Sequence, residues 1–346
     1  MQYPETAESL RLFDREREYT ASERAEAPSA ADTSQSRCLP ALVFGLAAVL
    51  LSGTASAQQN GWLRGSCESG SGVYRWVAGD RYEGECSNNR FEGRGTLTLA
   101  NGDRYEGEFR EDQKNGRGTY YFSSGDRYEG QFRNGRQHGR GTLIRTNGER
   151  YSGGWENGLK SGRGTFNFLN GDRYEGQWAN DLFNGQGTYT FSSGDRYEGQ
   201  WRDGERTRGT FYWTDGNRYE GQFQNNERHG QGTFWWTNDN RYVGQWRNGE
   251  QHGQGTKYWA NGDRYEGQWQ NDQMNGQGTF SYANGNRYEG GFRNDQLHGQ
   301  GTYYFSNGDR YVGPWLRGER DGPGTYYDAA GNSAPLEYRN GQRINR

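Results

Sequence analysis

The 23-residue stretch at positions 102–124 reads GDRYEGEFREDQKNGRGTYYFSS, and close copies of it fill most of the chain. A constant period of roughly 20 to 50 residues is typical of a repeat array, in which each unit buries its hydrophobic face against its neighbours. The sequence therefore predicts eleven tandem repeats over residues 79–330, of which only the sixth is one residue short. The copies begin at Gly79, Gly102, Gly125, Gly148, Gly171, Gly194, Gly216, Asp239, Gly262, Gly285 and Gly308.

Each copy has the pattern of a β-hairpin. Tyr105, Gly107 and Phe109 alternate with charged residues, which is typical of a half-buried strand. We expect a turn over residues 111–115, a second strand over 116–122, and a tight turn at an Asn-Gly or Ser-Gly pair into the next copy. The predicted fold class is all-β: an elongated, single-layer, twisted antiparallel sheet of about eleven tandem hairpins, with a half-repeat cap at 58–78 and a C-terminal cap at 331–346.

The positions that hold the same residue in all eleven copies include a tyrosine, as at Tyr82 and Tyr311, and the glycine two residues after it, as at Gly84 and Gly313. Glycine inside a strand weakens the strand unless the space is needed. A ring from a neighbouring strand can lie over such bare backbone. We therefore expect ring-on-glycine packing to form the core.

Composition alone would suggest disorder, because hydrophobic residues make up 29% of the chain and the mean hydropathy is −1.29. Aromatic residues, however, reach 15% and recur at fixed positions. We expect the chain to fold by stacking these rings rather than by collapse of aliphatic side chains.

Residues 1–57 differ in kind from the repeats. An apolar run from Ala41 to Leu51 precedes Ala55-Ser56-Ala57, the pattern of a signal-peptide core followed by a small-residue cleavage site. The run is short for a membrane span. We expect export to the periplasm or the cell exterior with cleavage after Ala57, and an uncleaved N-terminal anchor is the alternative. The acidic stretch 1–37 does not suit a signal peptide and suggests a start site assigned too far upstream.

The two cysteines of the expected mature chain suit an oxidising compartment. Cys86 stands where the other ten copies hold Phe or Trp. This substitution in the outermost repeat predicts a disulfide between Cys67 and Cys86, which closes that end and contributes roughly 3 kcal/mol through chain entropy. Two buried free thiols are the alternative.

Net charge argues against polyanion-binding classes. Residues 1–57 carry five basic and eight acidic residues, so residues 58–346 hold 36 of each. A nucleic-acid binder should carry a clear positive excess, and we expect no nucleic-acid partner.

The phrase Gly-Asp-Arg-Tyr-Glu-Gly-Gln-Trp, followed by a short turn and His-Gly-Gln-Gly-Thr, resembles the MORN (membrane occupation and recognition nexus) repeat. The resemblance covers about residues 62–331 and suggests a secreted, bacterial-type member. It implies a twisted sheet of hairpins that serves as a scaffold or interaction module, often dimeric, with lipid binding the activity most often attributed to the family. Larger members carry lipid-kinase or methyltransferase domains, for which we expect no room beside the signal and repeats.

Four histidines occupy the same position of their repeats, just before the Gly-x-Gly pair: His138, His229, His252 and His298. Residues at the same position of successive repeats, here called a column, lie about 10 Å apart across an intervening strand. Metal ligands must converge within about 2.1 Å of one ion. We therefore expect no metal within the chain and no cofactor, and zinc held between two chains is the alternative.

Paired carboxylates such as Asp103 and Glu106 can in principle hydrolyse glycosides. The pair recurs in most copies, whereas an enzyme needs one uniquely shaped site. We assign the Asp to the turn and the Glu to a charged face. The expectation is that the chain is not an enzyme and has no catalytic residue.

Binding candidates lie where the copies differ. Leu159, Lys160, Leu182, Phe183, Met274 and Leu297 are expected in loops. The richest ring cluster comprises Tyr212, Trp213, Trp235, Trp236, Tyr258 and Trp259. These rings are interpreted either as a ladder or groove for a glycan or peptide, or as core rings.

Arginine recurs at the same position of all eleven copies, from Arg81 to Arg310, and forms a stripe. We interpret the stripe as a solvated cross-strand ladder neutralised by nearby acids. The alternative is a track for anionic phospholipid headgroups that includes Arg218, Arg241 and Arg264.

The sequence thus predicts an exported, non-catalytic repeat scaffold that binds a protein or an envelope glycan through an aromatic-rich face, or that forms a homodimer. A membrane-associated binder of anionic phospholipid is the rival hypothesis. Nothing in the sequence names the ligand.

Overall fold

The computed structural model describes residues 60–64 and 67–344, and the predicted signal peptide and cleavage site lie outside these described residues. Strands, turns and bends make up the described residues, with no helix among them. The chain divides into two compact units, whose described parts are residues 60–64 and 67–192 with 202–204 (the N-terminal unit) and residues 193–201 with 205–344 (the C-terminal unit). The predicted all-β class is confirmed.

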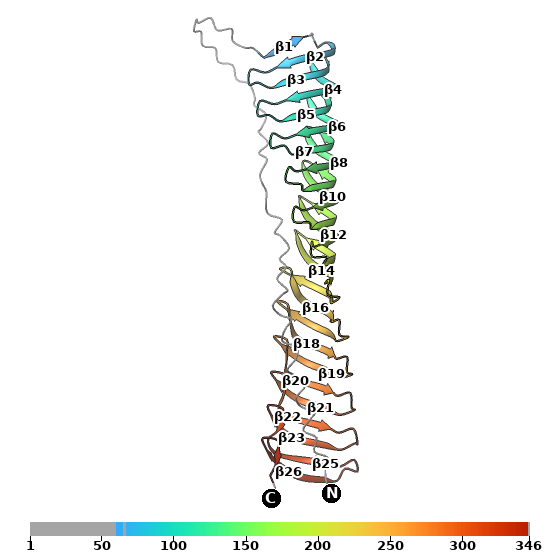
Figure 1. Ribbon diagram of the computed structural model, residues 1–346, viewed down its shortest axis with the longest axis vertical. Coiled ribbons are helices and arrows are strands. Elements are labelled where there is room, and N and C mark those ends of the chain that lie inside the picture. Colours follow the sequence, from blue (N-terminus) through green and yellow to red (C-terminus); the bar gives the residue numbers. More distant parts are fainter. Residues whose placement is uncertain (1–59, 65–66, 345–346) are drawn as a thin grey trace, which may run out of the picture. The chain divides into compact units, whose positions relative to one another are not determined.

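In the N-terminal unit each strand pairs antiparallel with the next along the chain, so the unit is an open meander of hairpins (Figure 1). Its strands are β1 (Gly61–Arg64), β2 (Ser69–Arg75), β3 (Arg81–Ser87), β4 (Arg90–Thr98), β5 (Arg104–Arg110), β6 (Gln113–Tyr121), β7 (Arg127–Arg133), β8 (Arg136–Ile144), β9 (Arg150–Glu156), β10 (Leu159–Asn167), β11 (Arg173–Ala179) and β12 (Leu182–Thr190).

The C-terminal unit repeats the same antiparallel pairing from β14 onward. Its strands are β13 (Arg196–Arg202), β14 (Glu205–Tyr212), β15 (Arg218–Gln224), β16 (Glu227–Trp235), β17 (Arg241–Arg247), β18 (Glu250–Tyr258), β19 (Arg264–Gln270), β20 (Gln273–Ser281), β21 (Arg287–Arg293), β22 (Gln296–Tyr304), β23 (Arg310–Leu316), β24 (Glu319–Arg320), β25 (Gly322–Tyr327), β26 (Ser333–Arg339) and β27 (Gln342–Arg343).

The turn inside a repeat is shorter than the predicted 111–115. Arg110 of β5 pairs with Gln113 of β6, so the loop is only Glu111 and Asp112, with φ of 47° and 62°. Positive φ at both loop residues defines the type I′ turn that matches the twist of a hairpin. The extra residues enter a bulge opposite β5, where Gly116 has a φ of 95°.

Successive loops between repeats are joined by hydrogen bonds to the Asp of the Gly-Asp-Arg-Tyr motif, or to the Asn that replaces it. Asp103 accepts a hydrogen bond from the Ser123 backbone N–H, one loop further along, at 2.7 Å. Asp80, Asp126, Asp172, Asp195, Asn217, Asn240, Asp263, Asn286 and Asp309 accept from the following loop in the same way. The assignment of this Asp to a turn is thereby confirmed.

The core lies on the face that carries the repeat tyrosines, here called the tyrosine face. Gly107 pairs with Gly118, and a Cβ added at Gly118 would lie 2.5 Å from Cζ of the Tyr105 ring. The ring therefore covers the bare backbone of a glycine pair, as predicted, although it comes from the same strand as one of the two glycines. All eleven repeat tyrosines are at most 1% exposed: Tyr82, Tyr105, Tyr128, Tyr151, Tyr174, Tyr197, Tyr219, Tyr242, Tyr265, Tyr288 and Tyr311.

The N-terminal end is closed as the sequence predicts. Cys67 and Cys86 form a disulfide, with their Cα atoms 5.5 Å apart. β2 pairs with β3 in the same register as β4 with β5. Gly72 therefore faces Gly84, and Tyr74 faces Tyr82 two residues away. Phe91 stacks on Tyr82 with ring centroids 3.8 Å apart, which continues the core to this end.

Candidate functional site

The six ring candidates divide between the two faces of the C-terminal sheet. Trp213, Trp236 and Trp259 follow the second strands and pack on the tyrosine face. Trp213 lies 4.4 Å from Phe211 and Trp236 lies 4.5 Å from Phe234, centroid to centroid. Both Phe rings are buried, so these tryptophans extend the core.

Tyr212, Trp235 and Tyr258 lie on the opposite face, here called the arginine face, and form what we name the aromatic row. Trp235 pairs in register with Arg218 and Arg241. The guanidinium carbon of Arg218 lies 3.8 Å from the Trp235 ring centroid, within cation–π range. Arg196 lies 4.7 Å from the Tyr212 ring and Arg241 lies 4.4 Å from the Tyr258 ring.

Most arginines of the predicted stripe are neutralised on the arginine face. Seven of them form an ion pair with the glutamate two residues on: Arg81, Arg104, Arg127, Arg173, Arg196, Arg264 and Arg287. Arg241 differs because Val243 stands where its glutamate would be, and Val243 is 40% exposed. The aromatic row is therefore flanked by a cation and an exposed aliphatic group.

The recurrent carboxylates have structural partners, as Asp103 and Glu106 show. Burial would raise the pKa of Asp103, but hydrogen bonds from the Ser123 backbone N–H, the Tyr120 hydroxyl and the Asn101 amide outweigh it and lower that pKa. Glu106 forms an ion pair with Arg104. Asp103 therefore holds a loop through hydrogen bonds, whereas Glu106 neutralises an arginine.

The residues expected in loops lie in strands, which corrects that prediction. Phe183, Met274 and Leu297 are buried on the tyrosine face, because the loops have only two residues and the alternation of faces runs on past the turn. Only Leu159, at 40%, is largely exposed. The Asn-Gly and Asn-Asp pairs just before these residues mark two-residue turns, and this signal in the sequence could have placed the residues in the strands that follow.

Lys160 is the most unusual member of this group. Its Nζ lies 5.8, 5.5 and 5.4 Å from the ring centroids of Tyr151, Phe166 and Trp178, and 3.5 Å from a carboxylate oxygen of Asp181. Burial lowers the pKa of Lys160, while Asp181 opposes the shift. The side chain covers a core tyrosine, as Phe183 does at the equivalent position two strands on.

The histidine column lies beside the bulges of the second strands. His138 pairs with Gln131, His229 with Gln222 and His252 with Gln245. Over residues 60–64 and 67–344 no group of three or more His, Cys, Asp or Glu side chains is placed to hold a metal ion.

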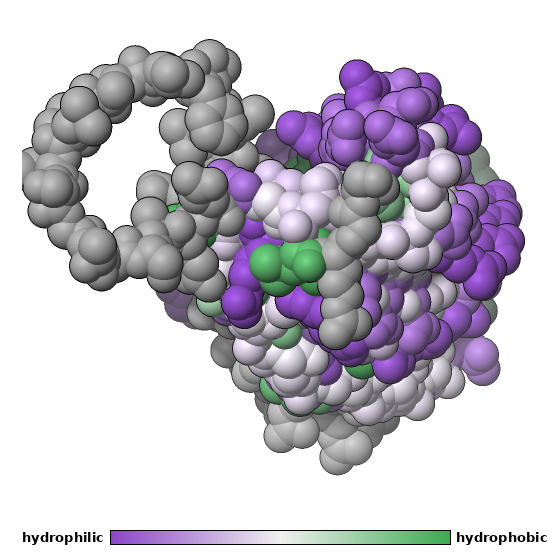
Figure 2. Space-filling view, turned by 90° about the horizontal axis from the view of Figure 1, so that it is seen from above, coloured by the Kyte–Doolittle hydropathy of each residue, from purple (hydrophilic) through white to green (hydrophobic). Residues whose placement is uncertain are grey.

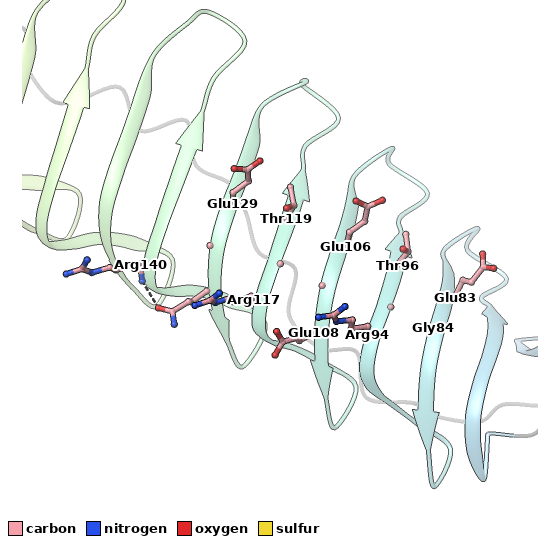
Figure 3. Close-up of a pocket in the computed structure, with 15 residues that line it drawn as sticks. Glu83, Gly84, Arg94, Thr96, Glu106, Glu108, Arg117, Thr119, Glu129 and Arg140 are labelled. Carbon is pink, nitrogen blue, oxygen red and sulfur yellow. Dashed lines mark hydrogen bonds between the residues drawn. The ribbon is translucent and has the colours of Figure 1, made fainter.

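The arginine face of the N-terminal unit carries a shallow groove of about 920 Å³ across β3 to β8. Figure 3 shows Glu83, Thr96, Glu106, Thr119 and Glu129 along one side and Arg94, Glu108, Arg117 and Arg140 along the other, with glycine backbone between. The groove crosses the strands rather than following one of them.

The visible surface is mostly hydrophilic, with hydrophobic residues scattered over it (Figure 2). Large exposed hydrophobic side chains are few among the described residues: Leu63, Val77, Leu159, Leu169, Val243, Val312 and Leu316. No helix of sufficient length and apolarity to cross a bilayer occurs within the described part of the chain.

An open antiparallel meander, with a tyrosine over a glycine pair in each hairpin, defines a β-hairpin repeat protein. The model of the MORN repeat matches twelve segments: residues 68–81, 82–104, 105–127, 128–150, 151–173, 174–196, 197–218, 219–241, 242–264, 265–287, 288–310 and 311–333. The chain therefore belongs to the MORN repeat family.

Similarity to individual proteins is slight. No curated protein matches the chain. The TCP domain of Drosophila melanogaster SAS-4 (dCPAP), solved with a proline-rich motif of Ana2, is 14% identical, with 52% of this chain and 99% of that one covered and a TM-score of 0.30. The G-box domain of the microcephaly protein CPAP is 12% identical, with 58% and 99% covered and a TM-score of 0.28.

Proposed function

We propose that this MORN-repeat chain is a non-catalytic scaffold that binds a protein or glycan partner through the aromatic row of its C-terminal unit. The observation that carries the proposal is the stack of Arg218 on Trp235 at 3.8 Å, set between Tyr212 and Tyr258 on a face that no second layer covers within the described residues. Trp, Tyr and Arg are the residues that most often dominate binding energy at interfaces.

The surroundings of the row support binding more than solvation. Val243 replaces a glutamate beside Arg241, and Gln222 and Gln245 occupy the neighbouring positions of the first strands. Interface centres are depleted of acidic residues and enriched in aromatic ones. A partner on this face would bury rings that are already ordered by their arginines, which lowers the entropy lost on binding.

The engagement of the recurrent carboxylates supports a role without catalysis. Each Asp of the repeat phrase fastens a loop, and most of the glutamates neutralise an arginine. Export to the periplasm or the cell exterior fits the Cys67–Cys86 disulfide, because such bonds persist in oxidising compartments.

The rival proposal, an anionic phospholipid track along the arginine stripe, has less support. Arg264 is ion-paired with Glu266, and six other stripe arginines are paired in the same way. A neutralised stripe attracts an anionic membrane weakly, since about 1 kcal/mol per free basic residue is the usual contribution.

The test immobilises residues 58–346 and challenges them with envelope extract, comparing the wild type with Trp235→Ala/Tyr258→Ala. The matched control is Tyr121→Ala/Tyr304→Ala, because these rings occupy the same column and also stack with arginines, but contact Glu106 and Glu289. We expect the wild type and the control to retain the same partner and the row variant to lose it. Equal retention by all three proteins would refute the proposal.

Sedimentation with phosphatidylglycerol vesicles distinguishes the phospholipid proposal from binding through the aromatic row. Salt-sensitive pelleting that Arg218→Gln/Arg241→Gln/Arg264→Gln abolishes and Trp235→Ala leaves intact would favour the lipid track.

A further inference from the structure

Five exposed arginines gather on the arginine face of the N-terminal unit, and we name them the arginine patch: Arg117, Arg133, Arg136, Arg140 and Arg163. They come from β6, β7, β8 and β10. Residues that pair across two strands point to the same face of the sheet. The pairs that place these arginines on the arginine face are Arg117 with Gln131, Arg133 with Arg136, Arg140 with Gly154 and Arg163 with Gln177. Four strand spacings separate β6 from β10, so the patch spans roughly 19 Å.

The patch is not neutralised within the described part of the chain. None of its five arginines forms an ion pair there, whereas Arg127 on the same face pairs with Glu129 at 3.1 Å. For Arg117, Arg140 and Arg163 the reason lies in the residues that face them on the neighbouring strand. The column of these facing residues holds Glu85 and Glu108 in the first two repeats, but Gln131, Gly154 and Gln177 in the next three.

This repeat position holds arginine in four consecutive repeats, at Arg94, Arg117, Arg140 and Arg163. In the later repeats it holds arginine only at Arg208 and glutamine at Gln186, Gln231, Gln254, Gln277 and Gln300. The overall neutrality of the mature chain therefore hides a local excess, which the net charge alone could not reveal.

Arg133 and Arg136 oppose one another directly across a two-residue turn. Like charges in register destabilise an antiparallel pair. Other hairpins avoid the conflict at these positions, with Arg110 facing Gln113 and Arg247 facing Glu250. No contact within the described residues compensates the Arg133–Arg136 pair, whereas an anion bound between the two guanidinium groups would.

The groove gives the shape of the ligand. Arg117 and Arg140 line it together with Arg94, one from every second strand, so their Cα atoms recur at about 9.6 Å. Figure 3 shows these three arginines along one side of the groove, with Glu108, which faces Arg94, among them. A ligand that lies across the strands and carries a negative charge at this interval would meet one guanidinium in each repeat.

We infer that the arginine patch and its groove bind a linear acidic polysaccharide, with carboxylates held by guanidinium groups. Arginine suits carboxylate because its planar fork can donate two parallel hydrogen bonds. The groove favours a linear polymer over a bilayer surface, which is broad and flat. A single-stranded nucleic acid would need exposed rings for its bases, and the groove lining contains none.

This inference does not depend on the aromatic row, which lies in the other unit and carries different chemistry. Loss of either site leaves the other intact, so the two proposals fail separately.

The test measures the affinity of residues 58–346 for polygalacturonate by titration at physiological salt, with dextran as the neutral polymer. The variant is Arg133→Gln/Arg136→Gln/Arg140→Gln. The control, Arg247→Gln/Arg293→Gln/Arg310→Gln, removes the same charge from the C-terminal unit. We expect binding of polygalacturonate and not of dextran, at least roughly tenfold weaker in the patch variant and unchanged in the control. We also expect weaker binding as salt is raised.

Equal losses in both variants would show unspecific attraction and overturn the inference, as would no binding of polygalacturonate by the wild type. Tighter binding of an oligonucleotide or of phosphatidylglycerol vesicles would overturn it in favour of another ligand. Removal of a like-charge pair should keep or raise the melting temperature of the patch variant. If that variant does not fold, Arg117→Gln/Arg163→Gln makes the same test without touching the turn.

Discussion

The hydroxyl of each repeat tyrosine explains why this column holds tyrosine rather than phenylalanine. The Tyr265 hydroxyl donates to the Gln268 carbonyl at 3.0 Å, and nine other repeats have the same bond. The exception is Tyr311, whose buried hydroxyl has no partner among the described residues and lies in a repeat that carries Pro314 in place of the usual glutamine. Burial raises the pKa of Tyr311 to about 12, so the hydroxyl stays neutral.

This exception supplies a matched pair of variants. Tyr265→Phe should lower the free energy of unfolding by about 1 kcal/mol, because it removes one hydrogen bond and leaves a carbonyl unsatisfied. Tyr311→Phe should be neutral or slightly stabilising, since it removes a hydroxyl without a partner. Urea denaturation of both variants checks the difference. A loss of the same size at both positions would contradict the assigned role of the hydroxyl.

Glycine is required at the paired positions because of space rather than backbone conformation. Gly118 has no positive φ, yet a Cβ there would meet the Tyr105 ring. Gly118→Ala should destabilise the protein by about 1–3 kcal/mol through overpacking. Gly61→Ala is the control, because a Cβ at Gly61 has nothing within 4 Å, and it should change the denaturation midpoint little. If both variants unfold at the wild-type midpoint, ring-on-glycine packing is not the core.

At the scale of the element, the loops depend on ionised Asp side chains. Asp172 accepts hydrogen bonds from the Ser192 backbone N–H at 2.7 Å, the Tyr189 hydroxyl at 2.6 Å and the Asn170 amide at 2.9 Å. Burial would raise the pKa of Asp172, but these bonds outweigh it and the pKa is lowered. A lowered pKa in the folded state means that the ionised carboxylate is bound more tightly there.

The pH dependence follows from this sign. The contribution of Asp172 is complete above its unfolded pKa of 3.8 and is lost as the pH falls through the lower folded value. Asp172→Asn keeps an oxygen acceptor, as Asn217 and Asn286 do at the same position, and should cost about 1 kcal/mol at pH near 7. Below the folded pKa the variant and the wild type should be equally stable. A constant difference across the acid range would show that ionisation of Asp172 is irrelevant.

The sequence alone predicts some features of the hairpins and not others. The period of the repeat and the two-residue alternation of faces were enough to predict an all-β meander and its core columns. The turn at Glu111 and Asp112 was missed, because neither residue signals a positive φ as Asn-Gly does at Asn134 and Gly135. The bulge at Gly116 then absorbs the residues that were assigned to the turn, and this depends on how β6 pairs with β5.

The sequence grouped the candidate rings without assigning them to faces of the sheet. Trp235 and Trp236 are adjacent, and neighbours in a strand point to opposite faces, so one joins the arginine face and the other the core. The arginine patch was missed for another reason. Its charge depends on which glutamates face which arginines across strands, and only the register shows that Arg140 faces Gly154.

At the scale of the whole molecule, stability is a sum of local terms. Within each unit a hairpin pairs only with the strands beside it, so a change at one end should not reach distant repeats. The Cys67–Cys86 disulfide ties β3 to the segment before β2 and thus acts on the first repeats alone. Phe91 on Tyr82 is the next point of support.

Reduction of the disulfide should therefore loosen one end and leave the rest folded. We expect amides of residues 69–98 to exchange faster with solvent in Cys67→Ser/Cys86→Ser than in the wild type, because a loop-closing bond worth about 3 kcal/mol is lost. Amides of residues 250–281, which no disulfide contacts among the described residues, should keep their protection. Hydrogen exchange read by mass spectrometry measures both segments in one experiment. Equal loss of protection in the two segments would mean that the repeats unfold as one cooperative body, and nearest-neighbour additivity would then have to be abandoned for this chain.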